Sequence, residues 1–192
     1  MASFVRRFPD GDERERMVCT DCGYVAYENP KIIVGAVVVA GDRVLMCRRA
    51  IEPRRGFWTL PAGFMELGET LEEGAAREAF EEAEAVITMD GVLCIFSIAR
   101  IGQVQVIFRA RFTHAEAPTF RPGRESLDAQ LFRWHEIPWD NIAFPSVQWA
   151  LNAWKAVGAA PLGAPLGNPA DDSRGVRGLS GPVVNGAADA PQ

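Results

Sequence analysis

The sequence predicts an α/β domain in which a mixed sheet is packed between helices. Three observations support this fold class. The segment KIIVGAVVVA at 31–40 is apolar and β-branched, as buried strands are. A T-x-x-E capping signature at Thr70 introduces one amphipathic helix. A second amphipathic segment, at 145–157, has apolar residues at i, i+3, i+4 and i+7. Strands on both sides of one helix, followed by a terminal helix, favour a layered arrangement.

The strands are predicted in the following order. A Gly-Asp turn at 41–42 joins the first strand to RVLMCRR at 43–49 as a hairpin. The segment GFWTL at 56–60 is a short strand that precedes the first helix. The segments 92–99 and 104–112 flank RIGQ and predict a second hairpin, and QLFRWHEI at 130–137 predicts one more strand.

Composition divides the chain of 192 residues into three parts. Residues 1–30 form an N-terminal arm that is loosely held up to about residue 16 and is then organised around Cys19-x-x-Cys22. Residues 31–157 form the main domain. Residues 158–192 contain seven glycines and five prolines without an aromatic residue, so we expect a disordered tail there.

Charge and hydropathy exclude several classes of partner. The formal net charge is -5, which argues against a nucleic acid held by bulk electrostatics. No run of 18 apolar residues predicts a membrane span, and the N-terminus has no apolar signal region, so we expect a cytoplasmic protein. The four cysteines are expected to be thiols or metal ligands rather than a disulfide framework.

The first helix carries an unusual concentration of negative charge. At about 100° per residue, Glu78, Glu81 and Glu82 fall in one arc, and Gly74 in the same arc is predicted to leave the surface bare for a ligand. One interpretation is a solvated acidic face, where like charges cost a few tenths of a kcal/mol per pair. The other is a site for hard divalent cations such as Mg²⁺. Helix geometry leaves both interpretations open.

The segment GFMELGETLEEGAAREAFEEAEA at 63–85 distinguishes between them. It matches the pattern G-x5-E-x7-R-E-U-x-E-E-x-G-U at six fixed positions: Gly63, Glu69, Arg77, Glu78, Glu81 and Glu82. This segment resembles the Nudix box, the signature of the Nudix hydrolases. The sequence departs from the pattern at Glu84, where the pattern has glycine, and Ala85 is a weak version of the last apolar residue. We expect Glu84 to point to solvent and to bind no metal.

The resemblance implies an α/β/α sandwich in which the box forms a loop–helix–loop. It also implies a site for Mg²⁺, with Mn²⁺ as a possible substitute, whose ligands are the main-chain carbonyl of Ala62 and the carboxylates of Glu78, Glu81 and Glu82. Arg77 and Glu69 correspond to a pair that orients these carboxylates. The resemblance leaves the general base open between Glu78 and Glu125, and Glu125 is equally well read as an ordinary loop acid.

The segment VCTDCGYVAYENP at 18–30 resembles the Nudix enzymes that have a zinc ribbon before the first sheet strand. A zinc ribbon needs four ligands, and this chain supplies one pair, because the first pair would fall at or before Met1. Bound Zn²⁺ at Cys19 and Cys22, or two residual thiols, both remain open. Cys47 and Cys94 lie in predicted strands and are expected in the core.

The segments 51–69, 100–112 and 121–144 resemble the FAD- and ADP-ribose-hydrolysing Nudix enzymes. This resemblance implies a pyrophosphatase that splits a nucleoside diphosphate linked to another group, with FAD or ADP-ribose as the favoured substrate and a homodimer as a possible state. An NADH or dinucleotide pyrophosphatase is the alternative enzyme. A Nudix-fold sensor that binds such a ligand without cleaving it is the alternative from another class.

Basic and aromatic residues are candidates for holding such a substrate. Guanidinium groups bind phosphate in a fork geometry. The candidates before the box, each of which could also be a solvated loop residue, are Arg48, Arg49, Arg54 and Arg55. An aromatic ring that stacks on a base is expected among Phe57, Trp58, Phe96, Phe108 and Phe144, most of which must belong to the core.

Overall fold

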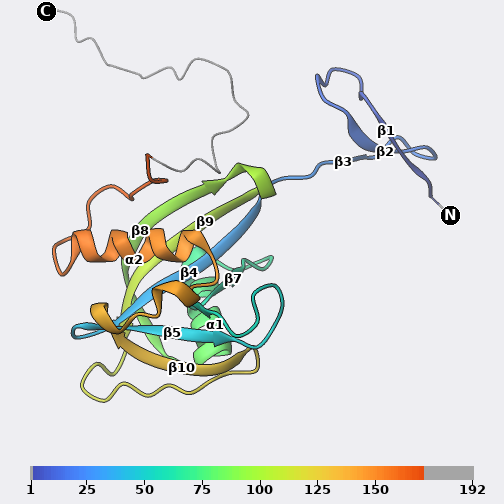
Figure 1. Cartoon of the computed structure of the whole chain (residues 1–192). Helices are drawn as coiled ribbons and strands as arrows, with labels where there is room; N and C mark the ends of the chain where they lie inside the picture. The colour runs from blue at the N-terminus through green and yellow to red at the C-terminus, as the bar shows by residue number, and fades with distance from the viewer. Residues whose placement is uncertain (1, 171–192) are drawn as a thin grey trace, which may run out of the picture. The chain divides into compact units, whose positions relative to one another are not determined.

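The computed structural model describes residues 2–170 of the chain and separates into two compact units that divide at Lys31 and Ile32 (Figure 1). The predicted disorder at residues 171–192 lies outside the described residues. No helix within 2–170 combines the length and the apolar character that crossing a membrane requires.

The N-terminal unit is a three-stranded antiparallel sheet. Its strands are β1 (Phe4–Arg7), β2 (Arg16–Cys19) and β3 (Val25–Ala26), in the order β1-β2-β3. The expectation that residues up to 16 are loosely held was wrong for β1, which pairs with β2 over its whole length. All four residues of β1 are exposed. Backbone pairing therefore orders this strand without apolar burial, whereas the expectation of a loosely held segment assumed that order requires such burial.

The C-terminal unit is built on a sheet of seven strands. Its main order is β10-β5-β4-β9-β8, while β6 pairs with β5 and β7 pairs with β4. The strand bounds are β4 (Lys31–Ala40), β5 (Arg43–Arg49), β6 (Trp58–Thr59), β7 (Ala62–Phe64), β8 (Ile87–Ile98), β9 (Gln103–Phe112) and β10 (Ser126–Arg133). The helices are α1 (Leu71–Ala83) and α2 (Pro145–Val157), with short 3-10 turns η1 (Ala99–Ile101), η2 (Trp134–Glu136) and η3 (Trp139–Asn141).

The two helices cover opposite faces of this sheet, and β4 shows why. Side chains alternate between the faces of a strand. Val34 and Val38 belong to the core that includes Ala75 and Ala83 of α1. Val37 belongs to the other core, which includes residues of α2 such as Val147, Ala150 and Leu151. The predicted α/β/α arrangement with a mixed sheet is therefore confirmed, and Figure 1 shows α1 and α2 on its two sides.

The observed bounds of β4, β5 and α2 agree with the prediction, whereas β6 is shorter than the predicted strand at 56–60, and β8 and β10 begin earlier than predicted. β8 begins at Ile87 rather than 92, because register shifts near Gly91 let the strand continue past a break in its apolar alternation. β10 begins at Ser126 rather than 130, and the end of the predicted strand is the turn η2. In that turn Trp134 packs edge-on against Trp139, with ring centroids 4.8 Å apart, instead of continuing the sheet.

The expected disorder from residue 158 onward is corrected for residues 158–170. Leu166 pairs with β8, since its N–H donates to the carbonyl of Leu93 at 3.0 Å and its carbonyl accepts from Ile95 N–H at 2.9 Å. The side-chain amide of Asn168 bonds both the N–H and the carbonyl of Ser97. Low apolar content predicted no core for this segment, but the open edge of β8 supplies backbone partners that composition cannot reveal.

Candidate active site

The helix α1 starts where the capping signature predicts. Thr70 Oγ1 accepts a hydrogen bond from Glu73 N–H at 3.1 Å, and the Glu73 carboxylate accepts from Thr70 N–H at 2.8 Å. This reciprocal pair satisfies two backbone donors that the first turn leaves open. It fixes the rotation of α1, and with it the direction in which the glutamates project.

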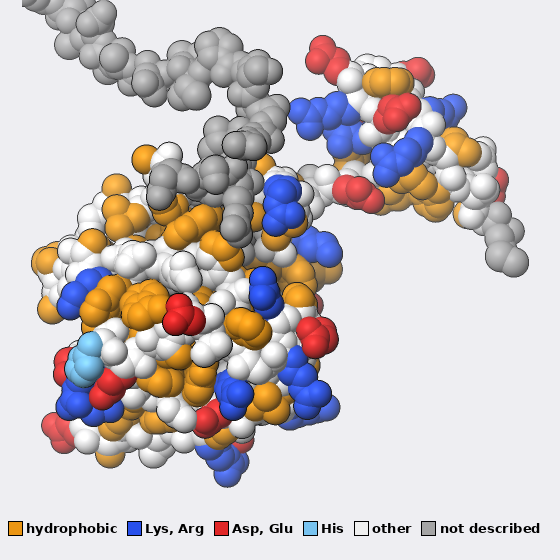
Figure 2. Space-filling view, in the orientation of Figure 1, with side chains coloured by type: hydrophobic (Ala, Val, Ile, Leu, Met, Phe, Trp, Pro, Cys, Tyr) orange, Lys and Arg blue, Asp and Glu red, His pale blue; other side chains and the backbone are white. Residues whose placement is uncertain are grey.

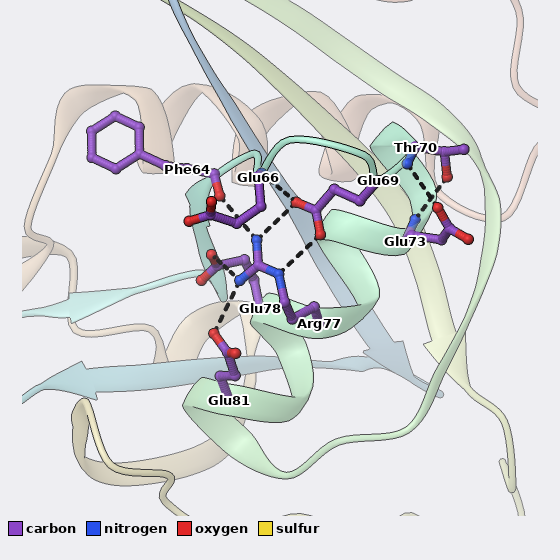
Figure 3. A network of polar contacts seen from close by, with 8 residues as sticks. All are labelled: Phe64, Glu66, Glu69, Thr70, Glu73, Arg77, Glu78 and Glu81. Carbon is purple, nitrogen blue, oxygen red and sulfur yellow. Dashed lines mark hydrogen bonds and ion pairs between the residues drawn. The ribbon is translucent and has the colours of Figure 1, made fainter.

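Arg77 joins the loop before α1 to the helix, as Figure 3 shows. Its Nε and Nη2 donate to the two oxygens of Glu69 at 3.0 and 2.9 Å, and Nη2 also donates to the carbonyl of Phe64 at 2.9 Å. Glu69 accepts a further bond from Glu66 N–H at 2.6 Å. The hydrogen bonds from Arg77 are the main reason that the pKa of Glu69 is lowered to about 2. The carboxylate is therefore held ionised at neutral pH.

The same guanidinium reaches two of the predicted metal ligands. Its Nη1 donates to Glu78 at 2.8 Å and to Glu81 at 3.0 Å. Glu81 is exposed, and α1 otherwise offers it no cation. Arg77 thus lies among three carboxylates and lowers their mutual repulsion. The resemblance implies that Arg77 orients the metal ligands, and this role stays a prediction.

Glu78 and Glu82 are the two buried carboxylates of the site, with 9% and 5% of their surface exposed. Burial is the largest cause of a raised pKa for both. Together with the charges of Glu78 and Glu125, it brings the pKa of Glu82 to about 8, and Glu125 also raises the pKa of Glu78. Glu82 is held by one weak hydrogen bond, from Ala62 N–H at 3.3 Å. Glu78 is paired with Arg77, whereas no ion pair of Glu82 is seen among the described residues, so this buried pair of acids is costly unless a further cation compensates it.

Two glycines of the box are required by close packing. A Cβ on Gly63 would overlap the carboxylate of Glu78. A Cβ on Gly74 would lie 2.6 Å from Glu69 Oε1 and 2.8 Å from Val34 Cγ2. The prediction that Gly74 leaves a bare surface for a ligand was therefore wrong. This residue is buried and lets α1 approach the sheet and the Glu69 carboxylate closely, which helical spacing alone does not reveal.

The loop that precedes β10 closes on the C-terminal end of α1. Gly123 N–H donates to the carbonyl of Glu82 at 3.0 Å, and a Cβ on Gly123 would overlap the backbone of Glu81. The carbonyl of Glu125 accepts from Ala50 N–H at 2.7 Å. These contacts bring Glu125, which is 43 residues from Glu82 in the sequence, into the lining of the same pocket.

The carboxylates open into a pocket of about 610 Å³. Residues from α1, β7, β9, η1 and the start of α2 line it. The polar part of its lining includes Arg49, Glu66, Arg77, Glu78, Glu81, Glu82, Arg100, Gln103, Gln105 and Glu125. Pockets of about 300–1,000 Å³ are typical of small-molecule sites.

Of the four arginines predicted to bind phosphate, Arg49 lines this pocket. Its guanidinium lies 5.2 Å from the ring centre of Phe144, which lines the pocket as well. The other three do not belong to the lining. Arg48 Nε donates to the carbonyl of Gly56, and the Arg54 guanidinium lies over the ring of Phe57. No contact of Arg55 places it at the pocket.

Several pocket residues were not predicted from the sequence. Arg100, Gln103, Gln105 and Trp149 all line it. The two glutamines share the face of β9 with the buried Ile107, since all three numbers are odd. Polar residues in inward register on a strand were the signal that could have found them. Phe96 and Phe108 are core residues, as expected for most of the aromatic candidates.

The donor set suits a hard divalent cation in its chemistry. Carboxylate oxygens converge on the pocket from Glu78, Glu81 and Glu82, and Ala62 of β7 lines it beside them. Within residues 2–170, however, no three His, Cys, Asp or Glu side chains already stand in a metal-binding arrangement. Two of these carboxylates, those of Glu78 and Glu81, are paired with Arg77 instead. In their chemistry, the residues of the site fit a divalent cation.

The Cys-x-x-Cys unit forms a tight turn. Gly23 N–H donates to the carbonyl of Cys19 at 3.0 Å, and Cys19 N–H donates to that of Tyr24 at 2.8 Å. The backbone N–H groups of Cys22 and Asp21 lower the pKa of the Cys19 thiol, which favours the thiolate. Cys19 and Cys22 would still supply only two of the four ligands that structural zinc needs. The described residues therefore do not complete a zinc site, and Cys47 and Cys94 are buried in the main core as predicted.

Comparison with known proteins adds to this geometry. A family model described as NUDIX domain matches residues 29–150, and one described as Nudix N-terminal matches residues 2–28. The crystal structure of a NUDIX hydrolase from Nitrosomonas europaea is 42% identical with a TM-score of 0.79, covering 86% of this chain and 93% of that one. The Nudix domain of Shewanella oneidensis NrtR in complex with ADP ribose is 22% identical with a TM-score of 0.55, covering 68% and 90%, which shows the fold alone.

Two curated relatives complete the comparison. An ADP-ribose pyrophosphatase of Methanocaldococcus jannaschii is 26% identical over 119 residues, which are 60% of this chain and 69% of that protein. An NAD-capped RNA hydrolase NudC of Haemophilus influenzae is 41% identical over 69 residues, which are 33% of this chain but about a quarter (25%) of that protein. Because the NUDIX domain model spans more than half of the chain, the chain belongs to the Nudix hydrolases, a family of enzymes that hydrolyse pyrophosphate bonds.

Proposed function

We propose that this enzyme is a divalent-metal-dependent pyrophosphatase that cleaves a nucleoside diphosphate linked to a second group. FAD and ADP-ribose are the favoured substrates, and Mg²⁺, with Mn²⁺ as a substitute, is the favoured metal. The observation that carries the proposal is the pocket of about 610 Å³, which combines two neighbouring buried carboxylates, of which Glu78 is paired with Arg77, with a large apolar lining. An anionic diphosphate would not bind beside such carboxylates without a cation between them.

Glu78, Glu81, Glu82 and the main-chain carbonyl of Ala62 would hold the metal. When bound, it would supply positive charge that neutralises the diphosphate and acidifies water. The chain's own residues do the rest. Arg77 keeps Glu78 and Glu81 in place through its bonds to Glu69, as partners behind metal ligands commonly do. Arg49 faces the pocket, where it would bind a phosphate oxygen.

A carboxylate must accept the proton of the attacking water. Glu78 and Glu125 both line the pocket, and both remain candidates for this base. Glu125 reaches the site on a loop rather than on α1, and it is free of the ion pair that Arg77 makes with Glu78. Glu125→Gln tests the assignment, because Glu125 is not among the proposed metal ligands. A loss of kcat with unchanged affinity for the metal would assign the base to Glu125, and an unchanged kcat would assign it to Glu78.

A substrate panel tests the proposal as a whole. Purified protein is incubated with Mg²⁺ and FAD, ADP-ribose, NADH or a nucleoside triphosphate, and products are measured after phosphatase treatment. We expect cleavage of FAD or ADP-ribose, a loss of at least about 100-fold for Glu82→Gln, and little change for Glu72→Gln, an exposed residue of the same helix. If Glu82→Gln matches the wild type, or no compound is cleaved, the proposal is wrong.

A second candidate substrate class is NADH or a related dinucleotide. The observation in its favour is the 41% identity to a NudC protein over 69 residues. Cleavage of NADH well above FAD and ADP-ribose in the same panel would support this class.

Basic side chains do not gather into one patch on the face drawn in Figure 2, which accords with the net charge of -5 and with a small-molecule substrate.

A further inference from the structure

The apolar part of the pocket comes from different elements than the carboxylates. Ile33 of β4, Ile98 of β8, Ile107 of β9 and Trp149 of α2 all line it, whereas the acids come from α1 and the loop before β10. A metal and a diphosphate are charged and do not require an apolar surface. A flat, largely apolar group attached to the diphosphate would be stabilised by this surface, because its burial removes apolar area from water.

Trp149 is positioned to contact such a group with its ring. It is half-buried, lines the pocket, and packs edge-on against the buried Phe96, with ring centroids 5.4 Å apart and planes 77° apart. Phe96 belongs to β8 and is fully enclosed in the core, so the indole has a rigid support. A supported aromatic ring in a pocket is a suitable partner for a nucleobase.

Two glutamines on β9 provide polar groups that could recognise a base. Gln103 and Gln105 project from the same face into the pocket, and Gln105 Nε2 donates to Gln103 Oε1 at 3.2 Å. Both amides are half-buried. In the described part of the chain this is the one side-chain hydrogen bond that either amide makes. It leaves the Gln105 carbonyl as an acceptor and the Gln103 amino group as a donor.

We propose that the Gln103–Gln105 pair and Trp149 form the base-binding part of the pocket and select adenine. This proposal rests on the proposed function and deepens it. A glutamine amide, with one donor and one acceptor, can pair with the N6 amino group and N7 of adenine. The O6 and N7 edge of guanine presents two acceptors, so it leaves the Gln105 carbonyl without a partner. A ligand that leaves a polar group of its binding site without a hydrogen-bond partner is strongly disfavoured.

The test uses the full-length protein without metal and measures nucleoside binding by calorimetry. Adenosine, guanosine, cytidine and uridine carry no phosphate, so the binding depends on the base part alone. We expect the wild type to bind adenosine about tenfold more tightly than guanosine. Gln105→Met and Gln103→Met keep the side-chain length but remove the amide, and we expect the preference to disappear in both. Gln130→Met, an exposed glutamine of β10, is the matched control and keeps it.

Trp149→Leu is expected to weaken all four nucleosides without changing their order, because stacking is tolerant of base identity. Absence of adenosine binding in the wild type, or an unchanged preference in both glutamine variants, overturns the proposal.

A hydrolysis assay distinguishes a failure of this proposal from a failure of the proposed function. If the wild type cleaves no diphosphate, the proposed function fails. If ADP-ribose is cleaved with the same KM by wild type and Gln105→Met, only the base assignment fails.

Discussion

Glu84 shows how a single residue departs from its motif at a local cost. It ends α1 with φ 47° and ψ 28°, in the left-handed region that glycine tolerates best. Its N–H donates to the carbonyl of Phe80 at 2.7 Å, which caps the end of the helix. Its carboxylate forms an ion pair with Arg121 and does not line the active-site pocket.

Two substitutions separate the backbone effect from the ion pair. Glu84→Gly and Glu84→Ala both remove the pair with Arg121, but only glycine adopts a positive φ without strain. We expect the glycine variant to be more stable than the alanine variant by roughly 0.5–1 kcal/mol, which is the strain relieved less the extra entropy of glycine in the unfolded chain. Urea unfolding measures the difference. Equal stabilities, or loss of hydrolysis by Glu84→Gly, would contradict this account.

The sequence was informative at residue scale where a motif fixes positions. It predicted the T-x-x-E cap at Thr70, which follows from local backbone geometry, and it identified Glu84 as the residue that stands where the pattern has glycine. The inward register of Gln103 and Gln105 on β9 was a signal for them in the sequence, but which end of that strand opens into the pocket depends on the fold. Likewise, the sequence could not choose Arg49 among four similar arginines.

At the scale of elements, the approach of α1 to the sheet depends on small residues. Ala75, Ala79 and Ala83 are fully buried on the inner face of the helix, and Gly74 stands beside them against Val34. Short side chains bring the helix axis close to β4. This closeness allows Glu69 and Arg77 to join the box loop to the helix. The sequence predicted α1 and its capping, but not which of its small residues are essential to packing.

Gly74→Ala provides a test in which local propensity and packing make opposite predictions. Alanine in a helix is more favourable than glycine by about 1 kcal/mol. Here the added Cβ would press on Val34 and on Glu69, and overpacking costs about 1–3 kcal/mol. We therefore expect a net loss of stability in urea unfolding and lower activity, because Glu69 is displaced from Arg77. Glu72→Ala on the exposed face is the control and should change little. A stabilised Gly74→Ala protein would show that packing there is looser than described.

At the scale of the whole C-terminal unit, the sheet has one edge that is completed late in the sequence. β8 pairs with β9 on one side, and on its other side residues near Leu166 and Asn168 supply its partners. The Arg109 guanidinium is also held there, by the carbonyls of Gly158 and Ala160 at 2.9 and 2.7 Å. An open strand edge is a template for pairing with another chain. Composition predicted disorder here because the stabilising groups are mostly backbone atoms.

Two shortened chains test this view. One ends at Ala170 and keeps the segment on β8, and the other ends at Val157 and loses it. We expect the longer chain to unfold like the full protein. The shorter chain loses backbone and amide hydrogen bonds worth about 0.5–1.5 kcal/mol each, largely offset by the entropy of ordering the segment, so a net loss of about 1–2 kcal/mol is expected.

The shorter chain should also self-associate more strongly, because the freed edge of β8 presents unpaired N–H and carbonyl groups to a second copy. Thermal unfolding at several concentrations measures the stability, and light scattering on a sizing column measures the mass. The full-length protein in the same column run tests the expected homodimer. If the chain ending at Val157 has the same stability and mass as the chain ending at Ala170, the segment is not what completes the sheet edge, and the pairing at Leu166 contributes nothing to the fold.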